Sequence, residues 1–167
     1  MKIRMLSAIM GLSVAAGSSM ALAEDATFDI TVMTPETAVK VAQVSLETCR
    51  SKGYQVSVVV VDRMGVPQAM IRDRFAGPHT PDTAYRKAWT AVSFREDTVA
   101  LSRNTASGTP QEGARQITKA LMLGGGIPIE AGGSIVGGVG ISGAPSGEAD
   151  DECGRAGIAA VSADLEF

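Results

Sequence analysis

Residues 56–73, VSVVVVDRMGVPQAMIRD, decide the predicted fold because they contain two strand patterns and the turn between them. β-Branched residues run from Val56 to Val61, which is typical of a strand buried within a sheet. Asp62-Arg63-Met64-Gly65 is a turn sequence, and Val66–Arg72 returns as a second strand. Pro67 favours an edge position for that second strand, since proline cannot donate a hydrogen bond to a neighbour. The stretch therefore predicts two strands joined as a hairpin.

Helical patterns lie on both sides of this hairpin. Before it, Thr34 is a good N-cap, Pro35 suits the first helical position, and Gly53 suits the helix end. After it, Thr80 is predicted to be the N-cap of a helix that has Pro81 at its first position. The predicted helices cover residues 34–53, 80–94 and 96–104, and a polar loop follows over 105–113. Ala84, Ala88 and Ala91 give the second helix a face of small residues for close packing.

The last third of the chain is rich in glycine. We predict strands over residues 121–123, 127–130 and 134–142, with bends at the glycines between them, and a final helix after Pro145-Ser146. Strands joined by hairpins with helices outside them indicate an α+β fold. The sequence therefore predicts a single compact domain with a mostly antiparallel sheet of about five strands flanked by helices.

The N-terminus has the features of a secretory signal peptide over residues 1–23. Lys2 and Arg4 precede an uncharged apolar run, and Ala21-Leu22-Ala23 matches a cleavage site. We expect a mature domain over residues 24–167, located in the periplasm or secreted. The apolar run is short for a bilayer span, and no later stretch is apolar enough, so no membrane span is predicted.

Charge argues against nucleic-acid binding. The predicted signal peptide carries two of the 15 basic residues and none of the 18 acidic ones, so its removal changes the net charge from −3 to −5. Phosphate-binding surfaces need a basic excess, and aromatic residues for base stacking make up only 4% of the chain. We therefore expect no nucleic-acid partner.

Two cysteines, Cys49 and Cys153, follow the predicted signal peptide. Each lies on the packed face of a predicted helix, Cys49 near the end of the first and Cys153 near the start of the last. If those helices are antiparallel on one side of the sheet, the thiols lie side by side, and export provides oxidising conditions. The alternatives are a Cys49–Cys153 disulfide and two separate buried thiols.

The glycine motifs favour packing over nucleotide binding. Gly138–Gly143 matches the letters of a dinucleotide fingerprint, but these glycines are predicted within a strand and not at a strand-to-helix turn. Gly124-Gly125-Gly126 lacks the ending of a P-loop. Asp150-Asp151-Glu152 begins the last helix, where contact with the helix dipole explains acidic residues better than a metal site does.

The chain's only histidine, His79, lies where the second long helix is expected to start, beside free backbone N–H groups. Such a corner suits an anion, and Arg72 and Arg74 could contact carboxylates. A neutral imidazole there could bind haem iron while the arginines hold the propionates. His79, Arg72, Arg74 and Thr80 are therefore the candidate ligand-binding residues, and the plain alternative is a polar loop that happens to contain a histidine.

Four segments together resemble the GlcG/HbpS-like haem-binding family, from about Thr34 to Ala160. They are VSVVVVDRMGVPQAMIRD, RKAWTA, GGGIPIEAGGSIVGGVGISG and DDECGRAG. The resemblance implies a compact domain with an antiparallel sheet, a homo-oligomer, and haem as the cofactor, with haem breakdown in some members. It makes His79 the natural position for an iron ligand, although versions of the motif without this histidine exist.

Three hypotheses follow from the sequence. The first is an exported haem-binding protein that stores, transfers or breaks down haem, with His79 on the iron. The second is a module that binds a small, glycolate-like carboxylate at the same corner. The third is an enzyme acting on such an acid with His79 as general acid or base. If His79 is not the iron ligand, the next candidates are Met64, Met70, Met122 and the hydroxyl of Thr80.

Overall fold

The predicted hairpin is present in the computed structural model. Strand β1 spans Ser57–Asp62 and pairs antiparallel with β2, Pro67–Arg72. The Asp62 carboxylate fixes the turn by accepting the backbone N–H groups of Met64 and Val66, at 2.8 and 3.0 Å. The valines of β1 are buried on both faces, as expected for a strand inside the sheet. Strand β2 lies at the sheet edge, the position that Pro67 predicts.

The structure describes residues 26–166, and those from Thr31 onward form one compact unit. The predicted signal peptide and its cleavage site lie outside the described residues. Within the described part of the chain, no helix is long and apolar enough to cross a membrane.

The sheet has four strands within residues 26–166, in the order β2-β1-β4-β3, and every pairing is antiparallel. Strand β3 spans Gly126–Ala131 and β4 spans Ser134–Ser142. The predicted strand over residues 121–123 is wrong, so the count of about five is corrected to four. The Leu121 N–H instead donates a hydrogen bond to the hydroxyl of Thr90, while Met122 packs against Leu101 in a small separate core. Side-chain and turn contacts thus replace sheet pairing in this segment.

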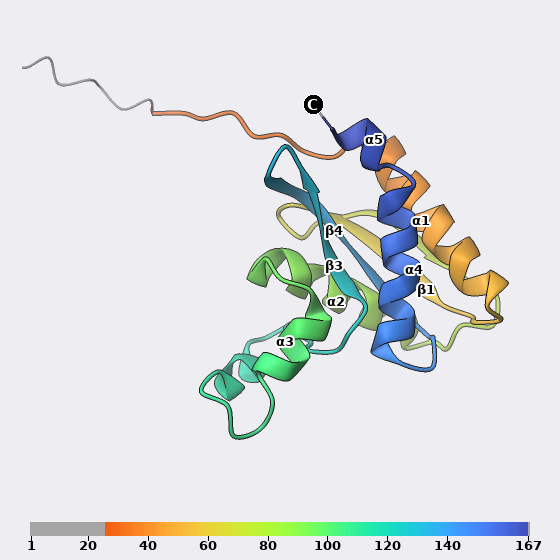
Figure 1. Cartoon of the computed structure of the whole chain (residues 1–167), viewed down its shortest axis with the longest axis vertical. Coiled ribbons are helices and arrows are strands. Elements are labelled where there is room, and N and C mark those ends of the chain that lie inside the picture. The colour runs from red at the N-terminus through yellow and green to blue at the C-terminus, as the bar shows by residue number, and fades with distance from the viewer. Residues whose placement is uncertain (1–25, 167) are drawn as a thin grey trace, which may run out of the picture. The chain divides into compact units, whose positions relative to one another are not determined.

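Helices cover both faces of the sheet (Figure 1). Helix α2 packs on one face, and α1 and α4 lie together on the other. Val59 and Val61 belong to the core under α2, while Val58 and Val60 face the core under α1 and α4. This alternation is the normal consequence of the two-residue period of a strand. The helices span Pro35–Ser51 (α1), Thr80–Phe94 (α2), Thr98–Asn104 (α3), Gly147–Ala159 (α4) and Ser162–Leu165 (α5), with a short 3₁₀ helix at Glu112–Gln116.

The glycine motif of β4 serves packing, as predicted. A Cβ placed on Gly140 would lie 2.0 Å from the carbonyl oxygen of Ala84, and one on Gly138 would lie 2.6 Å from Val92. Both neighbours belong to α2, whose small face rests directly on the strand. Gly138–Gly143 therefore allows a helix to approach the sheet and does not form a nucleotide loop.

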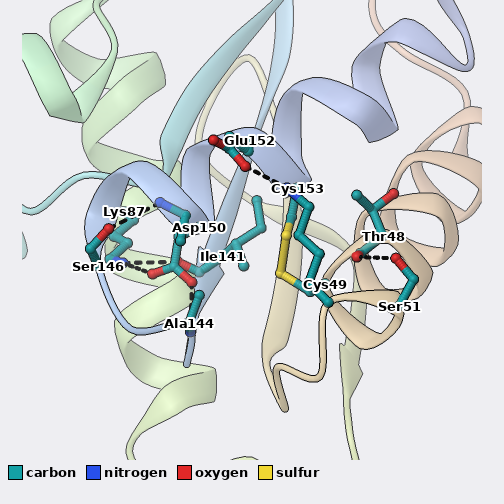
Figure 2. Close-up of a disulfide and its surroundings, with 12 residues drawn as sticks. Thr48, Cys49, Ser51, Lys87, Ile141, Ala144, Ser146, Asp150, Glu152 and Cys153 are labelled. Atoms are coloured by element: carbon teal, nitrogen blue, oxygen red, sulfur yellow. Dashed lines mark hydrogen bonds and ion pairs between the residues drawn. A yellow bond between two sulfur atoms is a disulfide. The ribbon is translucent and has the colours of Figure 1, made fainter.

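The predicted disulfide between Cys49 and Cys153 is confirmed. Its Cα atoms are 5.5 Å apart, and both residues are fully buried. Figure 2 shows the bond joining the end of α1 to α4, the helix that also carries Asp150. On α4, the disulfide therefore lies about one helical turn from Asp150.

Candidate functional site

His79 lies at the entrance of a cleft of about 560 Å³, a size typical of small-molecule sites. Its side chain is exposed, and its ring lies over Gly77, where an added Cβ would be 2.7 Å from the ring carbon Cε1. Helix α2 begins immediately after His79, and α4 begins after Ser146 on the other side of the cleft. The cleft is lined by Gly53, Tyr54, Gln55, Phe75, Gly77, His79, Thr80, Lys87, Leu123, Ser142, Gly143, Ala144, Pro145, Ser146, Gly147 and Asp150.

The prediction that Thr80 caps α2 is wrong. Thr80 is the first helical residue, and His79 holds the cap position without a capping hydrogen bond from its side chain. The Thr80 hydroxyl donates to the carbonyl oxygen of Gly77 at 2.7 Å and accepts from the hydroxyl of Ser57 at the same distance. These bonds attach the start of α2 to β1 and hold the backbone on which His79 stands.

A buried ion pair forms the floor of the cleft. The Lys87 ammonium donates to Oδ2 of Asp150 at 2.7 Å and to the carbonyl oxygen of Ile141 at 2.9 Å. The side chains of Lys87 and Asp150 are 2% and 4% exposed, so water does not separate them. The other oxygen of Asp150 accepts the backbone N–H of Ala144 at 2.9 Å. Figure 2 shows these groups together at the start of α4.

The triple glycine makes room for this pair. A Cβ on Gly125 would lie 2.5 Å from Cβ of Asp150, and one on Gly126 would lie 2.3 Å from the carbonyl oxygen of Lys87. Gly125 also has φ of +104°, a conformation that other residues rarely adopt. The glycines, which were predicted only to form a bend, thus allow α2 and α4 to bring Lys87 and Asp150 together.

Burial raises the pKa of the Asp150 carboxyl above its ordinary value, although Lys87 and the N–H of Ala144 act in the opposite direction. A carboxyl group whose pKa is shifted by burial inside a cleft is a candidate for a functional role. The interpretation of Asp150 as a partner of the helix dipole is therefore incomplete, since its main contact is Lys87.

A short turn carries the apolar rim of the cleft. Asp73 is buried and accepts two hydrogen bonds of 3.0 Å from the guanidinium of Arg50. The backbone N–H of Phe75 donates to the side chain of Gln55 at 3.3 Å. Phe75 is 79% exposed and Leu123 is 46% exposed, although both line the cleft. Their exposed apolar surface is suited to a large apolar ligand.

Two of the predicted site residues lie outside the cleft lining. Arg72 is exposed and its guanidinium donates to the carbonyl oxygen of Ala76, while the exposed Arg74 contacts Asp73 through its backbone. The alternative iron ligands Met64 and Met70 are exposed on the hairpin, and Met122 is buried; none of the three lines the cleft. The structure thus brings His79 and Thr80 together with Lys87 and Asp150 and leaves the two arginines outside.

Lys87 and Asp150 were missed as a pair by sequence reasoning, yet one indication was present. Lys87 follows Ala84 by three residues and precedes Ala91 by four, so it lies on the small-residue face of α2. A lysine on a packed face needs a buried partner. Its partner lies 63 residues away and could not be identified from local spacing.

Acidic residues beyond Asp150 form ion pairs. Arg155 donates to Asp151 and to Asp97, each at 2.6 Å, and Lys52 pairs with Glu152. Among residues 26–166, no group of three or more histidine, cysteine or acidic side chains is arranged to hold a metal ion. These contacts connect α4 to α3 and α1, and they lie outside the cleft lining.

The chain matches the family model described as haem degrading protein HbpS-like over residues 33–159. A double mutant of HbpS from Streptomyces reticuli is 37% identical, with a TM-score of 0.77 over 88% of this chain and 99% of that one. PduOC, solved as a haem complex, is 28% identical, with a TM-score of 0.73 over 78% of this chain and 95% of that one.

Protein ORFY of Klebsiella pneumoniae shares the fold at 23% identity, with a TM-score of 0.80 over 84% of this chain and 97% of that one. A search of curated proteins gave no match. The family model covers most of the chain and includes every residue that lines the cleft. On this basis, the chain belongs to the HbpS-like family of haem degrading proteins.

Proposed function

We propose that the protein is an exported haem-binding protein that stores, transfers or breaks down haem, and that the His79 imidazole binds the iron. Membership of the HbpS-like family supports haem as the ligand, as does the similarity to a protein solved in complex with haem. The observation that carries the assignment to His79 is its position. The chain's only histidine is exposed at a cleft that also presents Phe75 and Leu123.

The residues that line the cleft fit haem as a ligand. A neutral imidazole is a common axial ligand of haem iron, and the side chain of His79 is free of hydrogen bonds within the described part of the chain. Phe75 and Leu123 offer apolar surface to the flat faces of a porphyrin. Within this cleft, His79 would hold the iron, the apolar rim would shield the ring from water, and the hydroxyl of Thr80 would keep the start of α2 in place.

A hemin titration of the purified protein tests the assignment. We expect the wild type to develop a Soret band that saturates, and His79→Ala to weaken binding and shift the band because the iron loses its protein ligand. Arg103→Ala is the matched control, since Arg103 is exposed, lies outside the cleft lining and has no proposed contact with haem. Identical titrations for wild type and His79→Ala would place the iron ligand elsewhere.

The two arginines remain proposed contacts of the haem propionates at the edge of the site. We expect Arg72→Ala to weaken affinity and leave the Soret band in place, because a propionate contact does not touch the iron. A shifted band in Arg72→Ala would contradict this role.

The polar part of the lining favours a second candidate, a small organic acid as ligand or substrate. Ser142, Thr80 and Lys87 line the same cleft as His79, and this mixture suits a compact anion better than a porphyrin. In an enzyme of this type, His79 would act as general acid or base. A thermal-shift screen of small carboxylic acids without hemin tests this candidate, because a ligand that binds only the folded state raises Tm.

We also propose export and self-association. Cleavage after Ala23 would give a protein that begins at Glu24, and intact-mass analysis of protein recovered from the periplasm would detect it. The disulfide agrees with an oxidising location. Exposed apolar side chains on the hairpin, including Met64 and Met70, favour a homo-oligomer, and light scattering coupled to size-exclusion chromatography measures it.

A further inference from the structure

Lys87 and Asp150 are the charged side chains among the described residues that line the cleft, apart from the titratable His79. Their charges offset each other, so the pair alone adds no net charge to the site. The positive ends of α2 and α4 both face this region, because each helix begins at a residue of the lining. The floor of the cleft therefore favours an anionic group over a cationic one.

Lys87 retains one hydrogen for a ligand. An ammonium group has three N–H donors. Two of them are used by the oxygen of Asp150 and the carbonyl of Ile141, and within residues 26–166 no protein group accepts the third. Asp150 cannot easily turn toward another partner, since its second oxygen is held by the N–H of Ala144. The ammonium is thus fixed at the cleft floor with one donor available.

Folding alone does not explain the pair well. Removing both charges from water costs several kcal/mol per ion. Proteins in which apolar residues of similar size replace such a pair are often equally stable. Two consecutive glycines, Gly125 and Gly126, are nevertheless needed to fit the pair between α2, α4 and the sheet. Such an arrangement is expected where the charges contact a ligand.

We propose that Lys87 binds a carboxylate group in the cleft through this remaining N–H. The carboxylate is either a haem propionate, in which case the inference rests on the proposed function, or part of a free small organic acid. Asp150 holds the ammonium in place, and His79 lies at the entrance of the same cleft. If the carboxylate is a haem propionate, the iron would lie near His79 and this propionate would lie beside Lys87 at the floor of the cleft.

The first experiment compares hemin with hemin dimethyl ester, whose propionates are esterified, in wild type and Lys87→Met. The wild type should bind hemin at least about tenfold more tightly than the ester, which corresponds to one charge-assisted hydrogen bond. Lys87→Met should lose most of this preference, and the proposed propionate contacts of Arg72 and Arg74 account for what remains. A structural role for Lys87 would instead weaken both ligands by the same factor and leave their ratio unchanged.

Two further variants keep this test decisive. Lys87→Met/Asp150→Asn removes both charges and leaves no unpaired ion, so it protects against a folding defect of the single variant. It should lose the same share of the preference for hemin over the ester as Lys87→Met. Lys40→Met is the matched control, because Lys40 lies on α1, is 51% exposed and pairs with Asp164 outside the cleft. It should keep the wild-type preference.

The second experiment identifies the source of the carboxylate. Acetate, glycolate and lactate are added without hemin, and Tm is recorded for wild type and both Lys87 variants. An acid that raises the wild-type Tm and has no effect on the variants assigns a free acid to Lys87, even if hemin does not bind at all. Reduced discrimination between hemin and its ester in the variants, without an acid effect, assigns a propionate to Lys87. If the variants match the wild type in both experiments, Lys87 does not bind a carboxylate.

Discussion

Asp73 shows how a single residue supports the cleft without lining it. Its carboxylate is buried and receives two hydrogen bonds from Arg50 and one from the backbone N–H of Arg74. The hydrogen bonds from Arg50 are the largest cause of a pKa below the ordinary value of 3.8. Since the turn after Asp73 carries Phe75, this ion pair positions the apolar rim of the cleft.

The lowered pKa predicts how stability depends on pH. A carboxyl with a lower pKa in the folded state favours folding above its unfolded pKa, and this contribution is lost as pH falls through the folded value. Asp73→Asn should therefore lower Tm at pH 7, and the difference from wild type should shrink as pH falls below 3.8. Thermal unfolding of both proteins between pH 7 and pH 2 measures the effect. A difference that does not change with pH would mean that the charge of Asp73 contributes nothing.

Individual site residues were predictable only where local sequence decides their position. Proximity to a helix start places His79 at the cleft, and the sequence predicts this start to within one residue. The pairing of Lys87 with Asp150 depends on two helices that meet across the sheet, and no local pattern encodes it. The role of Thr80 was misjudged because a threonine before a proline resembles a cap. Its hydroxyl instead bonds Ser57 on a strand 23 residues earlier.

At the level of elements, the contact between α2 and β4 places the cleft. Ala84 and Ala88 of α2 lie directly against Gly140, where an added Cβ would be 2.0 Å from the oxygen of Ala84 and 2.6 Å from the nitrogen of Ala88. Both neighbours are backbone atoms of a helix, so they cannot move independently. This close approach brings Lys87, one residue before Ala88, next to Ile141 at the following position of the strand.

Gly140→Ala should therefore destabilise the fold by about 3 kcal/mol, at the upper end of the usual cost of overpacking. Gly113→Ala is the matched control, because a Cβ on Gly113 meets no atom within 4 Å. Urea unfolding followed by circular dichroism measures both variants. Equal midpoints for Gly140→Ala and Gly113→Ala would show that α2 can move away from β4 at little cost.

Most elements were predictable because their ends carry specific residues. Thr34 and Pro35 start α1, Ser146 caps α4, and the turn from Asp62 to Gly65 joins the hairpin strands as predicted. The strand prediction for residues 121–123 is wrong because a short apolar run is equally compatible with a strand and with a packed connecting segment. Which of the two forms depends on the tertiary contact between Leu121 and Thr90.

At the level of the whole molecule, the cleft is a junction of distant segments. Its walls come from the loop after α1, the turn after β2, the starts of α2 and α4, and the end of β4. The disulfide joins two of these walls, since Cys49 precedes the lining residue Gly53 by four residues and Cys153 follows Asp150 by three. The cleft therefore depends on the fold as a whole.

The disulfide should account for a large share of stability. It closes a separation of 104 residues, and the chain-entropy model assigns about 4–5 kcal/mol to a loop of this length, with less often measured. Cys49→Ala/Cys153→Ala should therefore unfold at a clearly lower urea concentration. A reducing agent should lower the wild-type midpoint toward that of the variant and leave the variant unchanged. Both cysteines are fully buried, so we expect reduction only in the unfolded state. Two free thiols per chain, counted in denatured, unreduced protein from an oxidising compartment, would contradict the bond itself.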